Sequence, residues 1–127
     1  MRFGYTILYV RDVPASVEFY ERAFDLKRRL LHDSGQYAEM ETGGTTLAFA
    51  AHDLAAANLP DDMSPGPPTE RPSFEVCLVT DDVKAGFDGA VDAGATAVSQ
   101  PQTKPWGQEV AYVRDPEGVL VEIASPA

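Results

Sequence analysis

Two segments of the chain repeat the same order of sequence features. Tyr5-Thr-Ile-Leu-Tyr-Val-Arg-Asp-Val13 aligns with Glu75-Val-Cys-Leu-Val-Thr-Asp-Asp-Val83. Each segment is followed by a helix-like stretch and then by a glycine-led apolar run, at residues 44–49 and 118–123. The repetition predicts a duplicated unit whose two halves place equivalent positions in equivalent parts of the fold. The residues at those positions are therefore the best guide to function.

The first half predicts a strand, a helix and three further strands. Residues 3–10 are rich in the β-branched and aromatic residues that strands favour. Asp12 can cap a helix from about residue 14 to residue 24, where Pro14 is tolerated in the first turn and apolar residues recur at helical spacing. Residues 26–32, 36–41 and 45–50 form three short strand-like stretches separated by glycine turns.

The second half predicts the same order of elements. A strand at 74–80 precedes a helix that Asp82 caps and Gly94 ends, and a short strand follows at 95–99. Residues 108–114 and 119–123 form a predicted hairpin, and Asp115-Pro-Glu-Gly118 between them has the residue order of a type I turn. Strand parity on residues 74–78 predicts that Phe74 faces the helix.

The fold class predicted by this pattern is α+β. Two βαβββ repeats, at residues 3–52 and 73–124, are expected to form one domain over residues 1–127 with a curved, mostly antiparallel sheet. Residues 53–72 contain five prolines and are expected to be a linker between the repeats.

The charge and the cysteine content exclude several classes of function. A formal net charge of −10 opposes binding to nucleic acid or to an anionic membrane, because both require basic patches. The chain has one cysteine, so neither an internal disulfide nor a cysteine-rich zinc site can form. We find neither a membrane-spanning apolar run nor a signal peptide, and a cytoplasmic location is the expectation.

Strand alternation places two carboxylates on one face of the predicted sheet. Glu75 and Cys77 alternate with helix-facing residues on one strand, and Glu122 does so on the last strand. If the two glutamates lie close together, repulsion between like charges raises the pKa of one of them. The pair is then a candidate for general acid or base catalysis, or for binding a metal or a cationic ligand. Cys77 is expected to be a buried, inert thiol.

Aromatic residues near the same face are candidate ligand contacts. Trp106 lies in a proline-containing loop at residues 101–108, beside Gln108, and can stack on a planar or cationic ligand or else cover an edge of the core. Tyr5 and Tyr9 share one face of the first strand. Tyr112 could extend this aromatic set, but its direction depends on whether Gly118 forms a bulge.

Three features of the chain are the repeat, the Val-Arg-Asp-Val13 segment and the Val113-Arg-Asp-Pro-Glu-Gly…Val-Glu-Ile123 ending. Together they resemble the vicinal oxygen chelate superfamily, which includes glyoxalase I, extradiol dioxygenases and bleomycin-resistance proteins. The resemblance implies a cup that in the enzymes holds one divalent metal. The implied ligand positions are Tyr5, Ala48, Glu75 and Glu122. Of these, Glu122 matches a common ligand type at its own position, whereas Ala48 cannot coordinate a metal. The histidines, His32 and His52, lie elsewhere in the sequence.

Two functions follow from these observations. The first is a homodimeric small-molecule-binding protein that holds an aromatic or cationic ligand in a cup or dimer groove lined by Tyr5, Tyr9, Glu75, Trp106 and Glu122. The second is a lyase, isomerase or dioxygenase in which Glu75 and Glu122 bind Mn²⁺, Fe²⁺, Ni²⁺ or Zn²⁺. The sequence does not identify the ligand, and it leaves open whether the protein is an enzyme.

Overall fold

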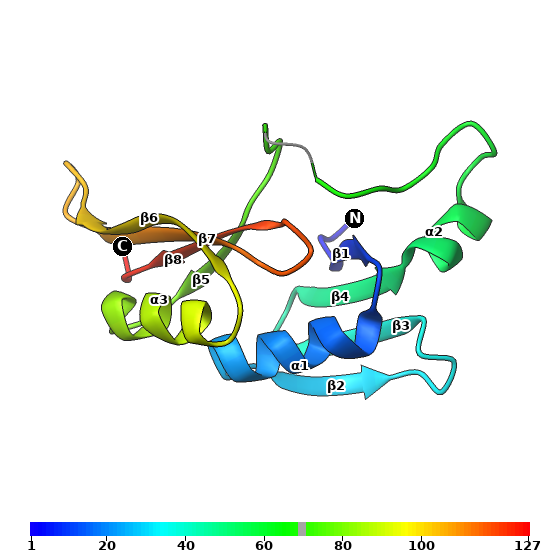
Figure 1. Cartoon of the computed structure of the whole chain (residues 1–127), viewed down its shortest axis with the longest axis horizontal. Coiled ribbons are helices and arrows are strands. Elements are labelled where there is room, and N and C mark those ends of the chain that lie inside the picture. The colour runs from blue at the N-terminus through cyan, green and yellow to red at the C-terminus, as the bar shows by residue number, and fades with distance from the viewer. Residues whose placement is uncertain (69–70) are drawn as a thin grey trace. The chain divides into compact units, whose positions relative to one another are not determined.

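The structure is a computed structural model that describes residues 1–68 and 71–127, and it divides into two compact units. The first unit comprises residues 1–21 and 25–67, and the second comprises residues 22–24 and 68–127. Each unit contains one four-stranded sheet (Figure 1). These sheets and the helices confirm the predicted α+β class. The predicted linker at 53–72 includes residues 69 and 70, which lie outside the described residues.

The first sheet has the strand order β1-β4-β3-β2. Its strands are β1 (Tyr5–Val10), β2 (Lys27–Leu31), β3 (Tyr37–Glu41) and β4 (Thr46–Ala51). The β1–β4 pair is parallel and the other two pairs are antiparallel. A bulge interrupts the β2–β3 register between Arg28 and Leu30, and bulges of this kind re-aim nearby side chains.

Helix α1 (Val13–Phe24) follows β1 and covers one face of the first sheet. Asp12 caps it as predicted, because its carboxylate accepts a hydrogen bond of 3.1 Å from the backbone N–H of Ala15. On this face the ring of Tyr20 lies 5.1 Å from the ring of Phe49 on β4.

The two faces of β1 differ as strand alternation predicts. Leu8 and Val10 are buried on the face that α1 covers. Tyr5, Ile7 and Tyr9 point to the opposite face, which we call the open face of the first sheet, and they are 54%, 45% and 40% exposed. A short helix, α2 (His52–Asn58), follows β4 directly and occupies the beginning of the predicted linker.

The second sheet repeats this plan with the strand order β5-β8-β7-β6. Its elements are β5 (Val76–Val79), α3 (Val83–Asp92), β6 (Thr96–Thr103), β7 (Glu109–Arg114) and β8 (Leu120–Ala124). The β5–β8 pair is parallel, and the other pairs are antiparallel. Helix α3 packs against β6, β7 and β8, and Asp82 caps it through the backbone N–H of Ala85 at 3.0 Å.

Two sequence expectations about the second unit are wrong. Strand β6 extends through Pro101 to Thr103, beyond the predicted end at residue 99. An irregular register between Ser99 and Gln102 accommodates the proline, which has no N–H to donate. Phe74 lies outside β5 and is 52% exposed, so it does not pack on the helix side.

The β7–β8 turn forms as its sequence predicts. The backbone N–H of Gly118 donates a hydrogen bond of 2.9 Å to the carbonyl oxygen of Asp115. The buried carboxylate of Asp115 accepts two more, from the N–H groups of Glu117 and Val119, both at 2.9 Å. Gly118 has φ +91°, a conformation that favours glycine. The turn therefore fixes the register of the two strands that carry the candidate site.

In the part of the chain that is described, no helix has the length and apolar character needed to cross a membrane.

Candidate functional site

The register of the second sheet gathers four chemically active side chains on the face opposite α3. Glu122 on β8 lies between Cys77 on β5 and Tyr112 on β7. Glu75 lies just before β5, and its interaction with Glu122 places its carboxyl group on the same side. We call the face that bears these four residues the open face of the second sheet. The register also settles the direction of Tyr112, which the sequence left undecided.

The carboxyl groups of Glu75 and Glu122 interact directly. A hydrogen bond with Glu122 is the largest cause that raises the pKa of Glu75 to about 7, followed by desolvation and by the negative charge of Glu122. Between pH 4.5 and about 7, Glu75 in the folded protein therefore retains a proton that an isolated glutamate has released. Glu75 is exposed, so solvent screens part of this interaction.

The same face raises the pKa values of the other two groups. Desolvation is the main cause for both Tyr112 and Cys77, and the charges of Glu122 and Glu75 add to it. The expectation of a buried Cys77 is wrong, because this residue is exposed. Its raised pKa nevertheless keeps the sulfur in the protonated, weakly nucleophilic form. The face therefore presents acceptors and neutral donors and no activated nucleophile.

Trp106 lies at the tip of the turn between β6 and β7 and is 69% exposed, so it does not cover the core. Its indole N–H donates a hydrogen bond of 2.9 Å to Oε1 of Gln108. The amide of Gln108 in turn donates one of 2.7 Å to the carbonyl oxygen of Ser125. These contacts fix the indole ring against the turn. These two hydrogen bonds connect Trp106 and Gln108 to the C-terminal end of the chain at Ser125 and not to Glu75 or Glu122.

Tyr5 and Tyr9, the remaining predicted ligand contacts, lie on the open face of the first sheet. In the register of that sheet, Ala48 lies between Ile7 on β1 and Glu39 on β3. Ala48 is the repeat equivalent of Glu122, so the first unit carries its carboxylate one strand away from the position that the resemblance indicates. The sequence reasoning did not identify Glu39.

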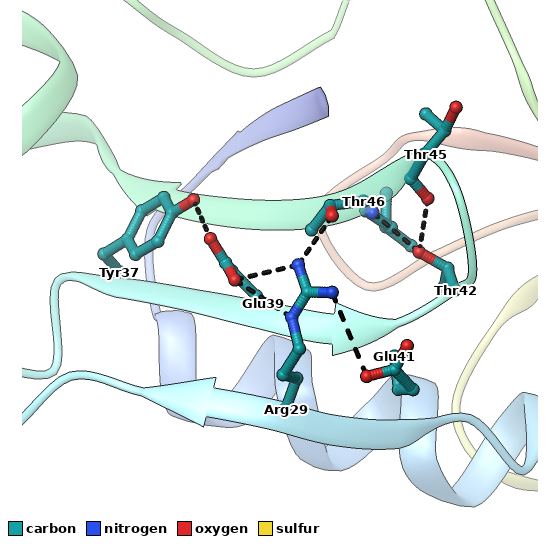
Figure 2. Close-up of polar contacts among 8 residues, drawn as sticks. Arg29, Tyr37, Glu39, Glu41, Thr42, Thr45 and Thr46 are labelled. Carbon is teal, nitrogen blue, oxygen red and sulfur yellow. Dashed lines mark hydrogen bonds and ion pairs between the residues drawn. The ribbon is translucent and has the colours of Figure 1, made fainter. Parts of the chain in front are cut away.

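Glu39 belongs to a polar network that the sequence analysis missed (Figure 2). Nε and Nη2 of Arg29 donate hydrogen bonds of 3.1 and 3.0 Å to Oε1 of Glu39, and Nη2 also donates one of 2.6 Å to Oγ1 of Thr46. The hydroxyl of Tyr37 donates one of 2.8 Å to the other oxygen of Glu39. Tyr37 and Glu39 are two residues apart on one strand, so the sequence alone could have predicted that they share a face. The position of Arg29 depends on the β2 bulge and could not be predicted in this way.

We tested whether the residues present fit the divalent metal that the resemblance implies. Among the described residues, no group of three or more His, Cys, Asp and Glu side chains is arranged to hold a metal ion. Glu75 and Glu122 supply two carboxylates, whereas transition metals in such sites prefer a set that includes imidazole. His32 and His52 are both in the first unit, and Nδ1 of His32 is 2.8 Å from Oγ of Ser34. The donor set within the second unit does not fit a tightly held transition metal.

A protein-family model supports the assignment suggested by the repeat and by the fold of each unit. The model for the Glyoxalase/Bleomycin resistance protein/Dioxygenase superfamily matches residues 2–123. The chain belongs to this superfamily. The match includes strands of both sheets and the residues Glu75 and Glu122.

Individual relatives agree with this family and do not identify an activity. The uncharacterized protein YraH of Bacillus subtilis (strain 168) is 26% identical over 117 residues, which are 91% of each chain. A glyoxalase-related enzyme from Fulvimarina pelagi has a TM-score of 0.85 at 19% identity, over 99% of this chain and 88% of that one. A protein of unknown function from Agrobacterium tumefaciens str. C58 has a TM-score of 0.82 at 25% identity, over 100% of this chain and 95% of that one.

Proposed function

We propose that this superfamily member binds a small molecule that carries a cationic group and an aromatic ring. The observation that carries the proposal is the Glu75–Glu122 pair on the open face of the second sheet, where Glu122 raises the pKa of Glu75 to about 7. A cationic group can replace the proton on Glu75 and restore the attraction that the pair lacks when both groups are ionised. The protein's net charge of −10 further favours a cation over an anion at this site.

Tyr112 supports the proposal because it lies beside Glu122 in the register of β7 and β8. Its raised pKa keeps the phenol neutral at physiological pH, so the ring offers a face for cation–π contact and a hydroxyl that donates. Trp106 is proposed to supply a further aromatic contact in the second unit, and Gln108 to hold its indole ring in place through their hydrogen bond. Tyr5 and Tyr9 are exposed on the first sheet and are not part of this cation site.

Calorimetric titration tests the role of the carboxylate pair. The probes are benzyltrimethylammonium, which is cationic, and neopentylbenzene, its neutral isostere, at pH 7.5. We expect the cation to bind and the isostere to bind more weakly, and we expect Glu122→Gln to weaken cation binding by about fivefold to tenfold, as for a partly exposed charge pair. Glu109→Gln is the matched control, because Glu109 is on the same sheet three residues before Tyr112 and points to the opposite face.

Two results would count against the proposal. One is equal binding of the cation and its isostere, and the other is equal loss of affinity in the Glu122 and Glu109 variants. Failure of aromatic cations of different sizes to bind or to raise the unfolding temperature would have the same meaning.

Acid–base catalysis by Glu75 is the second candidate function. A carboxyl group whose pKa is about 7 is half-protonated at physiological pH, which suits a group that both accepts and donates a proton. The metal-dependent version of this alternative is tested by elemental analysis of protein purified without chelators. A stoichiometric divalent ion that is lost on Glu122→Ala would favour an enzyme over a binding protein.

We also propose that the protein is a homodimer, as the resemblance implies. Light scattering coupled to size-exclusion chromatography measures the mass directly. The monomer mass is 13.7 kDa, so a dimer and a monomer are easily distinguished. A monomer at all concentrations that bind ligand would contradict this part of the proposal.

A further inference from the structure

The open face of the first sheet combines exposed aromatic side chains with a positive charge that only partly engages its partners. Tyr5, Ile7 and Tyr9 form one border on β1, and Tyr37 and Glu39 form the other on β3. The β4 residues between these borders include Ala48 and Ala50, whose side chains are single methyl groups. An exposed Tyr–Ile–Tyr row is costly to leave in water, and such surfaces often serve binding.

Arg29 reaches this face from the β2 bulge, and one end of its guanidinium group is held firmly. Nε and Nη2 make the hydrogen bonds to Glu39 and Thr46 given above, while the hydroxyl of Tyr37 holds the second oxygen of Glu39. The pKa of Tyr37 is raised to about 12, mainly by desolvation and by this hydrogen bond, so Tyr37 stays protonated and continues to donate. The orientation of the guanidinium plane is therefore set before any ligand arrives.

The other end of the guanidinium group is weakly engaged. Within the described part of the chain, Nη1 lies 3.9 Å from Oε2 of Glu41, a separation too long for a hydrogen bond (Figure 2). The Glu41 side chain is 56% exposed, whereas that of Glu39 is 15% exposed. Glu41 can therefore move away from Nη1 at low cost, whereas Glu39 cannot.

We propose that this face binds the carboxylate of a small aromatic acid, with Nη1 of Arg29 as the group that receives it. The incoming carboxylate replaces the distant Glu41, and the ring of the ligand packs against Tyr5 and Tyr9 above the two alanines. Glu39 and Thr46 act as positioning residues, because they orient Arg29 and do not contact the acid. The site lies wholly on the first sheet, so it does not depend on the proposed role of Glu75 and Glu122.

NMR titration with benzoate and 1-naphthoate tests this inference, with the Nε–H signal of Arg29 as the readout and benzamide as the neutral control. The measurements use 150 mM salt, because the protein's negative charge repels anions at lower ionic strength. We expect both acids to shift this signal in a saturable way and benzamide not to do so. Glu41→Gln removes the competing carboxylate and should tighten benzoate binding about threefold, as expected for an exposed charge pair.

Two arginine variants complete the test. Arg29→Gln should abolish acid binding. Arg28→Gln should leave it unchanged, because Arg28 pairs at 2.8 Å with Glu21 of α1 on the other face of the sheet. The Glu41 variant retains every hydrogen bond that holds Arg29, so it stays informative even if Arg29→Gln fails to fold. Absence of a benzoate response in both wild type and the Glu41 variant, equal binding of benzamide, or unchanged binding in Arg29→Gln would overturn the inference.

Discussion

Replacing Glu122 by glutamine removes two of the three causes that raise the pKa of Glu75, its hydrogen bond with Glu122 and the negative charge of Glu122. The pKa of Glu75 is raised from 4.5 to about 7, mainly through the hydrogen bond with Glu122. In Glu122→Gln the neighbour is neutral and its amide can donate to an ionised Glu75. We therefore expect the pKa of Glu75 to fall toward its ordinary value, with desolvation still raising it.

The sign of the effect on stability follows from proton linkage. Between pH 4.5 and about 7 the folded protein keeps a proton on Glu75 that the unfolded chain has released. The folded state binds more protons in this window, so the free energy of unfolding decreases as the pH rises through it. The pair is consequently least favourable to the fold above pH 7, and Glu122→Gln should gain stability there relative to wild type.

The exposure of Glu75 limits the size of this change in the free energy of unfolding. A shift from 4.5 to about 7 corresponds to roughly 3 kcal/mol at ~1.4 kcal/mol per pKa unit, if the group were shielded from solvent. Because Glu75 is exposed, screening reduces this value, and we expect about 1 kcal/mol. Between pH 5 and pH 8, wild type should thus lose about 1 kcal/mol more unfolding free energy than Glu122→Gln.

Urea unfolding at pH 5 and pH 8 measures this difference, and ¹³C NMR of the glutamate carboxyl groups measures the pKa of Glu75 itself. Glu109→Gln is again the control, and it should follow wild type. If the wild type and the Glu122 variant lose the same stability over this range, and Glu75 titrates near pH 4.5 in both, Glu122 does not raise the pKa of Glu75 and the basis of the proposed cation site is wrong.

Three further predictions concern residues outside the carboxyl pair or next to it. Asp115→Ala should lower the free energy of unfolding by roughly 2 kcal/mol in urea titrations, because it leaves two turn N–H groups without their acceptor; a loss below ~0.5 kcal/mol would show that water replaces the carboxylate easily. Gly118→Ala should cost about 1–2 kcal/mol because its φ of +91° strains a residue with a Cβ atom, and a circular dichroism melt equal to that of wild type would contradict this. Cys77 should react with iodoacetamide at pH 8 more slowly than glutathione despite its exposure, and faster in Glu122→Gln; equal rates in wild type and variant, measured by mass spectrometry, would refute the electrostatic explanation.

Sequence alone predicted the features that depend on local pattern. Alternation on β1 and β8 gave the faces of Tyr5, Tyr9 and Glu122, and the caps at Asp12 and Asp82 followed from residue type and spacing. The turn before β8 was also predicted, because its aspartate, proline and glycine occupy the positions that a type I turn requires. These features need little information from distant parts of the chain.

The features that sequence missed depend on register between strands. The β2 bulge that directs Arg29 to the open face has no distinctive residue of its own, and the continuation of β6 through Pro101 depends on a local irregularity with β7. Tyr112 could be assigned to the face of Glu122 only when the β7–β8 register was known. The exposure of Cys77 likewise depends on the order of the strands, because β5 is an edge strand that pairs with β8 in its sheet.

Ala48 and Glu39 have a consequence for how members of this superfamily are compared. Aligned by position, the first repeat lacks the carboxylate found at Glu122, because alanine occupies the equivalent place. In space, Glu39 is the cross-strand neighbour of that alanine, so an acidic group remains beside the vacated position and is tied there by Arg29 and Tyr37. Searches for active members that score single alignment columns will overlook such displaced acids, whereas searches that include the residues paired across neighbouring strands will find them.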